Sequence, residues 1–180
     1  MKKLWIIDAP KKFNPQKDIL LGPWCLEDKG YEYYEKNSFD FSINSLDPYE
    51  QMSIDAKNTR NFADSYVVLL SKKFNLLLGT DYSSNFWRII IMPWLLTLTE
   101  NTWEKQKIID DFIQKNKNKN IEVDLIENSE AWNFKNTQEF VNYCLKSKQF
   151  NLWLYSRLIE SKIPPIFVIN LDLCFIIPIL

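Results

Sequence analysis

The chain offers few residue types that could do chemistry. Its 180 residues include no histidine, which excludes Ser-His-Asp and Cys-His catalysis and a histidine metal site within the chain. A general base would therefore be Asp or Glu, or less often Tyr, Lys or Cys. The three cysteines, Cys25, Cys144 and Cys174, are odd in number and far apart, so they predict no disulfide framework and favour a reducing cytoplasm. The spacing of these residues assigns no catalytic group.

Arg88 is the side chain with the clearest potential to bind a ligand. It lies in the first turn of an apolar helix predicted from near Ser84, where exposed backbone amides favour an anion. A guanidinium in apolar surroundings must find partners or reach water. Two interpretations stay open: Arg88 pairs with a carboxylate such as Asp81 or Asp64, or snorkels to the surface; or it helps to hold a phosphate or carboxylate ligand.

Two helices must position this arginine. Apolar residues at helical spacing predict an amphipathic helix over 55–78, which Gly79 ends. A second helix is predicted over 84–115, with a kink or break at 89–92 because Pro93 removes a backbone donor and clashes with the preceding turn. A short polar turn between the two helices predicts an antiparallel hairpin.

Three short apolar segments predict the strands of a mostly parallel sheet. Segments 4–7 and 19–21 are buried in character, and segment 121–126 alternates apolar with acidic residues. A helix, a basic loop and a strand follow one another before 121, which is the pattern of a crossover connection. The third strand is therefore expected to join the first two in one parallel sheet.

Gly22 and Trp24 directly follow the second predicted strand. A strand that ends in a glycine turn is where an α/β sheet places ligand loops. No GxGxxG or Walker pattern accompanies this glycine. Trp24 and Cys25 therefore keep two interpretations, as packing at the sheet edge or as the lining of a pocket.

The remaining pattern sets the predicted extent of the domain. Asn136 and Glu139 predict a capping box at the start of a further helix. We expect one α/β domain over 1–180, with an irregular insert at 27–53 and an apolar tail at 163–180.

Charge and hydropathy exclude several classes of partner. A net charge of −1 and a pI of about 5.6 do not indicate nucleic-acid binding, which needs a basic face. The apolar stretches are too short for a transmembrane helix, so membrane contact is predicted to be at most peripheral, through the tryptophan-rich helix. The expected location is the cytoplasm, including the inner face of the membrane.

One motif resembles that of a known family. The run FWRII at 86–90, followed by PWLL at 93–96, resembles a motif of spirochaete-type transferases of bacterial surface-carbohydrate biosynthesis, of O-antigen or capsule kind. That motif reads aromatic-Trp-Arg-Ile-(Ile/Leu)-x-Gly-Pro-Trp-Leu, and Met92 here replaces its glycine. Further segments resemble the family in order: 19–26, 66–78 and 140–159.

The resemblance implies a fold and a role. The fold would be α/β, a helix-rich, Rossmann-like lobe. It would be the N-terminal lobe of a two-lobed, GT-B-like glycosyltransferase, and this lobe would receive the acceptor, a carbohydrate or a lipid-linked sugar. A nucleotide-sugar donor is expected only with a C-terminal lobe, and neither a cofactor nor a metal is expected in this chain. The residues that the resemblance implies on the acceptor side are Gly22, Trp24, Trp87, Arg88 and Trp94.

A second hypothesis comes from another class of function. The chain would be a truncated, non-catalytic fragment or a protein-interaction module, and its partner would be a C-terminal lobe or a second copy. The missing histidines, the missing second lobe and the apolar end CFIIPIL motivate it. A fragment of this kind should expose apolar surface and associate.

Overall fold

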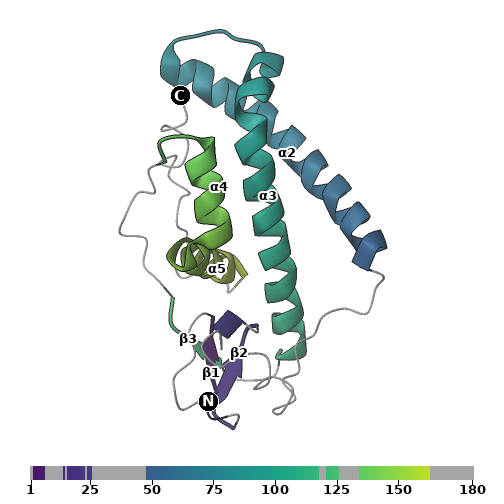
Figure 1. Ribbon diagram of the computed structural model, residues 1–180, viewed down its shortest axis with the longest axis vertical. Helices are drawn as coiled ribbons and strands as arrows, with labels where there is room; N and C mark the ends of the chain where they lie inside the picture. Colours follow the sequence, from purple (N-terminus) through teal and green to yellow (C-terminus); the bar gives the residue numbers. More distant parts are fainter. Residues whose placement is uncertain are drawn as a thin grey trace. The chain divides into compact units, whose positions relative to one another are not determined.

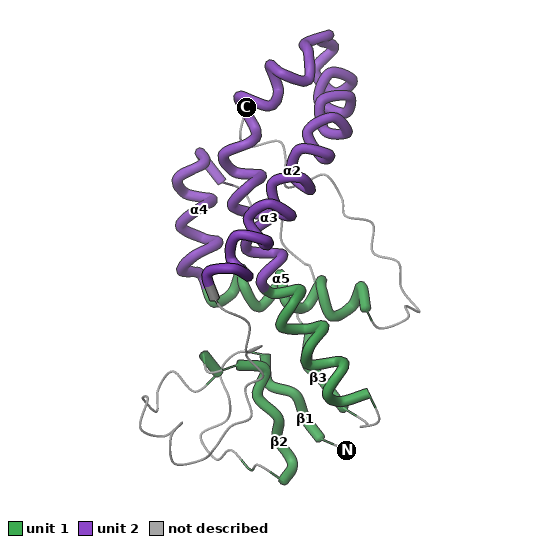
Figure 2. Tube along the Cα trace, turned by 90° about the vertical axis from the view of Figure 1, so that its right-hand side faces the viewer, with its two compact units in different colours: residues 1–44, 105–130, 148–170 green, residues 45–104, 131–147, 171–180 purple. Residues whose placement is uncertain are grey.

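The computed structural model describes residues 2–6, 14, 16–22, 24–25, 48–117, 121–125 and 134–162. In this part of the chain the elements follow one another as β1, β2, α2, α3, β3, α4 and α5 (Figure 1). The chain divides into two compact units, each assembled from separate stretches of sequence (Figure 2). Unit 1 contains residues 1–44, 105–130 and 148–170, and unit 2 contains 45–104, 131–147 and 171–180. The single domain expected over 1–180 stays a prediction.

A small parallel sheet forms the base of unit 1. It consists of β1 (Lys2–Trp5), β2 (Asp18–Leu20) and β3 (Ile121–Val123), in the order β2-β1-β3. Both neighbours run parallel to β1, and Leu4 lies opposite Ile19 on one side and Val123 on the other. The predicted α/β class and the joining of the third strand to the first two are confirmed.

The first two strands begin earlier than their apolar runs predict. Lys3 belongs to β1 because its backbone N–H donates to the carbonyl oxygen of Lys17 at 2.8 Å. Its ammonium lies 2.6 Å from a carboxylate oxygen of Asp124, and this hydrogen bond raises the pKa of Lys3. The paired parts of the strands thus include polar residues whose side chains reach solvent. Hydropathy alone does not predict that such residues belong to a strand.

Two helical segments supply the rest of the core of unit 1. They are the part of α3 from Lys105 onward and α5 (Lys148–Lys162). One buried cluster unites the sheet with both segments, which explains how a sheet of three short strands is stabilised. Its members are Leu4, Ile6, Leu21, Ile109, Tyr155 and Ile159.

Two long helices dominate unit 2, α2 (Pro48–Leu78) and the first part of α3 (Ser84–Lys115). The predicted hairpin is confirmed: Gly79 ends α2 with φ of +64°, a conformation that suits glycine, and α3 begins at Ser84. α2 begins at Pro48, so its first turns take up residues 48–53 of the predicted irregular insert. The rest of that insert, 27–47, and the apolar tail at 163–180 lie outside the described residues.

Of the kink or break predicted at 89–92, the break is wrong and the kink stays a prediction. α3 continues through this proline without interruption to Lys115. Pro93 is exposed, and so is Ile89, whose carbonyl group loses its helical donor to the proline. Water can hydrate that carbonyl oxygen on the outer side of the helix, and the helix is therefore maintained.

The predicted capping box at α4 (Thr137–Lys146) is confirmed in modified form. The Asn136 side chain accepts a hydrogen bond from the Glu139 backbone N–H at 2.9 Å. The Glu139 carboxylate accepts at 2.5 Å from the N–H of Lys135, one residue before the cap. Phe134 is buried and meets the ring of Phe140 edge to face at 5.2 Å, which fixes the entry of the chain into the helix.

Candidate functional site

The strand order of unit 1 marks one edge of its sheet as the place for a ligand. The chain passes from β1 to β2 on one side and later adds β3 on the other side of β1. In parallel α/β sheets, ligands bind beyond the carboxyl ends of the strands at such a reversal of order. The residues described directly beyond β1 and β2 are Ile6, Leu21, Gly22, Trp24 and Cys25.

The side chain of Trp24 is held at this edge of the sheet by a hydrogen bond and by close packing on a glycine. Its indole N–H donates to the carbonyl oxygen of Ile6 at 2.7 Å, just past the end of β1. Its ring lies directly over Gly22: a Cβ atom built on that glycine would come within 2.2 Å of two ring carbons. Gly22 is therefore required for the close approach of the indole ring, and the two predicted residues form one structural feature.

A tyrosine and a lysine from distant helices extend this feature. The ring of Tyr155 in α5 is stacked on Trp24 with centroids 5.8 Å apart and an angle of 15° between the ring planes. The ammonium of Lys105 in α3 lies 5.3 Å from the centroid of the Tyr155 ring. Lys105 is only 8% exposed, an unusual degree of burial for a lysine, whereas Trp24 is half-buried. We call Gly22, Trp24, Tyr155 and Lys105 the sheet-edge cluster.

Two interpretations were open for Cys25, packing at the sheet edge or lining of a pocket, and its surroundings agree with packing. It is buried, its thiol donates to the carbonyl oxygen of Trp5 at 3.2 Å, and its backbone N–H donates to the carbonyl oxygen of Gly22. The same oxygen of Trp5 accepts the N–H of Leu21 at 3.0 Å. These bonds tie the turn after β2 to the end of β1 and hold the sheet-edge cluster in place.

The other three predicted site residues belong to unit 2, along α3. Arg88 pairs through Nη1 with a carboxylate oxygen of Asp64 in α2, one of the two partners that the sequence analysis considered. Trp94 is 3% exposed and packs edge to face on Phe140. Its indole N–H has no hydrogen-bond partner among the described residues. Arg88 and Trp94 thus contribute to the joining of α3 with its neighbours in unit 2.

The indole N–H of Trp87 is paired with the side chain of Asn75, a residue that the sequence patterns did not mark as functional. Trp87 is buried, stacks on Phe74 with centroids 4.9 Å apart, and donates its indole N–H to Asn75 Oδ1 at 2.8 Å. The same oxygen accepts from the Thr80 hydroxyl and from the Tyr82 backbone N–H, and Asn75 Nδ2 donates to the Tyr82 carbonyl oxygen at 2.8 Å. The sequence contained one indication of this role: Asn75 is the single polar residue in the apolar run 74–78.

The structure therefore brings Gly22 and Trp24 into contact within unit 1, and it places Trp87, Arg88 and Trp94 within unit 2. Lys105 and Tyr155 join the first pair, although neither stood among the predicted site residues. The described residues hold no group of three or more acidic, cysteine or histidine side chains arranged for a metal ion. Within the same residues, none of the helices has the length and apolar character needed to cross a membrane.

Comparison with known proteins gives one match. The model of a family described as LIC12162 family transferase matches residues 4–172, which is most of the chain. No curated protein and no solved structure matches the chain.

Proposed function

The chain belongs to the LIC12162 family of transferases, and we propose that its reaction is a glycosyl transfer in the assembly of bacterial surface carbohydrate. In this proposal the chain is the N-terminal, acceptor-side part of a two-lobed, GT-B-like enzyme of the spirochaete type. Its acceptor is a carbohydrate or a lipid-linked sugar. The nucleotide-sugar donor binds only with a C-terminal lobe, and this chain contributes no cofactor site.

The observation that carries this proposal is the sheet-edge cluster. A half-buried indole, held by Ile6 and by a glycine that permits its close approach, offers a rigid aromatic surface at the edge where α/β sheets bind ligands. The apolar faces of sugar rings pack well on such a surface. Because Trp24 is fixed before the ligand arrives, little conformational entropy is lost on binding.

Lys105 adds a positive charge to the sheet-edge cluster. Its ammonium is buried beside the ring of Tyr155, where the low dielectric strengthens its attraction for a negative group. Lipid-linked sugars carry phosphate, and many surface sugars carry carboxylate. We propose that a sugar ring of the acceptor packs on Trp24 and that the positive charge of Lys105 favours an anionic acceptor from a distance.

In this proposal the three predicted site residues of unit 2 have a structural role and do not contact the acceptor. Trp87 and Trp94 are too deeply buried to stack on a sugar, and Arg88 is paired with Asp64. They support α3, the helix that also carries Lys105. The reaction is proposed to take place in the cytoplasm or at the inner face of the membrane, without a nucleic-acid partner.

Acceptor binding tests the proposal. The purified chain is titrated with neutral sugars, sugar phosphates, a polyprenyl-phosphate-linked sugar and nucleotide-sugars, while tryptophan fluorescence and melting temperature are recorded. We expect a saturable change with phosphorylated or lipid-linked sugars. Trp24→Phe should weaken this binding about fivefold or more, since an aromatic contact contributes about 1 kcal/mol.

Trp5→Phe is the matched control. Trp5 belongs to the same unit and also uses its indole N–H, which donates to Asp18 at 3.0 Å. This variant should bind as the unchanged chain does. The proposal fails if no sugar derivative changes either signal, or if Trp24→Phe binds as tightly as Trp5→Phe.

A further inference from the structure

The end of the α2–α3 hairpin exposes an unusual number of apolar side chains. Leu76 is 84% exposed and Ile89 is 80% exposed, one near the end of α2 and the other near the start of α3. Figure 1 shows these two helices joined at one end by a short connection. We call the exposed apolar side chains around this connection the hairpin-end surface; they are Leu76, Leu77, Leu78, Tyr82, Phe86 and Ile89.

We propose that the hairpin-end surface inserts shallowly into a bilayer that contains anionic lipid. Apolar side chains at the end of a hairpin can enter the boundary between headgroups and acyl chains while the helices themselves stay outside. The proposed contact is peripheral, and none of the described helices is long and apolar enough to cross a membrane. This inference goes beyond the proposed function and does not depend on it.

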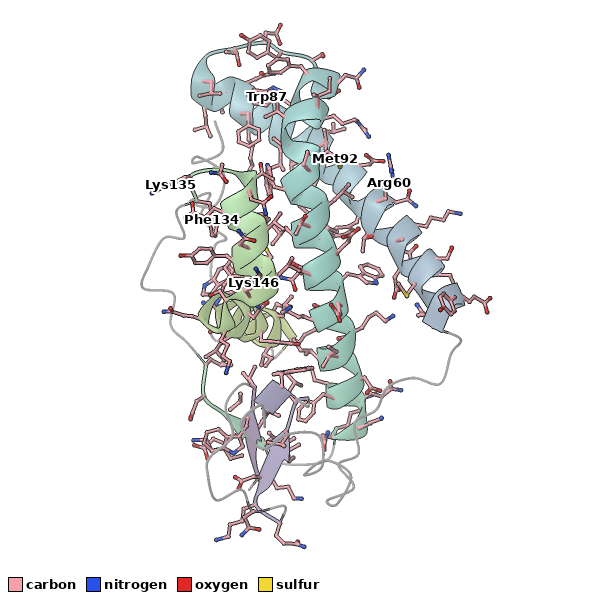
Figure 3. All side chains as sticks on the ribbon, viewed as in Figure 1. Arg60, Trp87, Met92, Phe134, Lys135 and Lys146 are labelled. Atoms are coloured by element: carbon pink, nitrogen blue, oxygen red, sulfur yellow. The ribbon has the colours of Figure 1, made fainter. Side chains whose placement is uncertain are left out.

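The connection is held in one conformation, so its exposed side chains are not those of a frayed helix end. Four hydrogen bonds of Asn75 tie together Thr80, Tyr82 and Trp87. Phe74 and Trp87 are buried and stacked, and Figure 3 shows Trp87 close to the connection. The interior of the hairpin end is thus already filled by these rings, and the leucines and Ile89 remain outside it.

The charges beside this surface suit an anionic membrane. Lys72 and Lys73 are exposed and lie one helical turn before Leu76 and Leu77, and residues at this spacing are neighbours on the helix surface. From 72 to 99 the sequence contains one carboxylate, Asp81. The lysines can extend their ammonium groups to lipid phosphates while the leucines enter the apolar layer.

The aromatic residues agree with an interfacial position. Tyr82 and Phe86 are stacked with centroids 4.2 Å apart, and both are partly exposed. A tyrosine beside an apolar surface suits the headgroup level, where its ring is apolar and its hydroxyl stays hydrated. The predicted peripheral contact was through the tryptophan-rich helix, but Trp87 and Trp94 of this helix are buried, so the exposed residues of the hairpin end make the proposed contact instead.

Vesicle flotation of the full chain tests this inference. The chain is mixed with phosphatidylcholine vesicles, with or without one quarter phosphatidylglycerol, and its dissociation constant is measured at low and at high salt. We expect binding to the anionic vesicles that weakens with salt. Leu76→Ser and Ile89→Ser should each weaken it about tenfold, because burial of such a side chain contributes more than 1 kcal/mol. Leu145→Ser, which changes a leucine of α4 that is 70% exposed, should leave binding unchanged.

A second pair of variants keeps the test independent of folding. Lys72→Gln and Lys73→Gln change exposed side chains and should each weaken binding about fivefold, while Lys57→Gln, also exposed and on α2, should have a smaller effect. Three results would overturn the inference: no binding to anionic vesicles, equal losses with Leu145→Ser and Leu76→Ser, or a lysine pair without effect. A change of sedimentation coefficient in Leu76→Ser without vesicles would instead assign the surface to contact between copies of the chain.

Discussion

Replacing Asn75 by alanine should destabilise the chain far more than its position near a helix end suggests. The side chain makes four hydrogen bonds, and each of them reaches residues beyond the end of α2. One of its partners, the indole N–H of Trp87, belongs to a residue that is 1% exposed. Without Asn75 this donor remains buried and unpaired.

The expected loss in the free energy of unfolding follows from these contacts. A buried donor left without a partner costs about 1–3 kcal/mol. The bonds to Thr80 and Tyr82 are nearer the surface, so water replaces them and their loss adds about 1 kcal/mol. Alanine favours the helix by about 0.6 kcal/mol relative to asparagine, which opposes the loss. We therefore expect a net destabilisation of about 2 kcal/mol.

Denaturant unfolding followed by tryptophan fluorescence measures this quantity. Asn61→Ala is the matched control, because it makes the same change at an exposed site of the same helix and should be neutral or slightly stabilising. A double-mutant cycle with Trp87→Phe isolates the indole bond and should give a coupling energy of about 1 kcal/mol. A loss below about 0.5 kcal/mol, with no coupling to Trp87, would refute the assignment of Asn75 as the residue that holds the hairpin end.

Two further predictions concern unit 1. Gly22→Ala places a methyl group 2.2 Å from ring carbons of Trp24, so the indole must move; we expect a loss of stability of about 1–3 kcal/mol and a shifted fluorescence maximum. Burial raises the pKa of Asp110, but hydrogen bonds from Gln106 and Lys162 outweigh it, and the pKa lies below its ordinary value. The stability from this carboxylate is therefore present above about pH 4 and is lost as the pH falls through the folded-state pKa. Asp110→Asn should flatten the decline of melting temperature below about pH 4, and an unchanged slope would contradict this.

The sequence predicted the larger elements because they depend on local patterns. The hairpin required only helical periodicity, a glycine and cap residues, and α2 ends at Gly79 as expected. The start of β1 at Lys2 was missed because strand pairing is decided by another segment of backbone. The break before Pro93 was predicted from the proline alone, whereas the outcome depends on whether the carbonyl group of Ile89 can meet water.

The candidate site also combines residues that are close in sequence with residues that only the tertiary fold brings together. Gly22 and Trp24 are close in sequence, and both belong to the segment 19–26 through which the chain resembles the transferase family. Lys105 and Tyr155 come from helices far along the chain, so no local pattern indicates that they meet Trp24.

The partner of Arg88 is a contact that the predicted hairpin alone did not decide. The sequence left Asp81 and Asp64 as equal candidates, and the structure pairs Arg88 with Asp64. In an antiparallel hairpin, residues at similar distances from the turn lie side by side, as Phe74 and Trp87 do. Asp81 belongs to the turn itself. Asp64 lies ten residues before Phe74, so the predicted hairpin did not select it, and the pairing with Arg88 comes from the structure alone. Because this pair is partly exposed, Asp64→Asn should cost at most about 1 kcal/mol, and a larger loss in denaturant unfolding would mean that the pair does more than brace the hairpin.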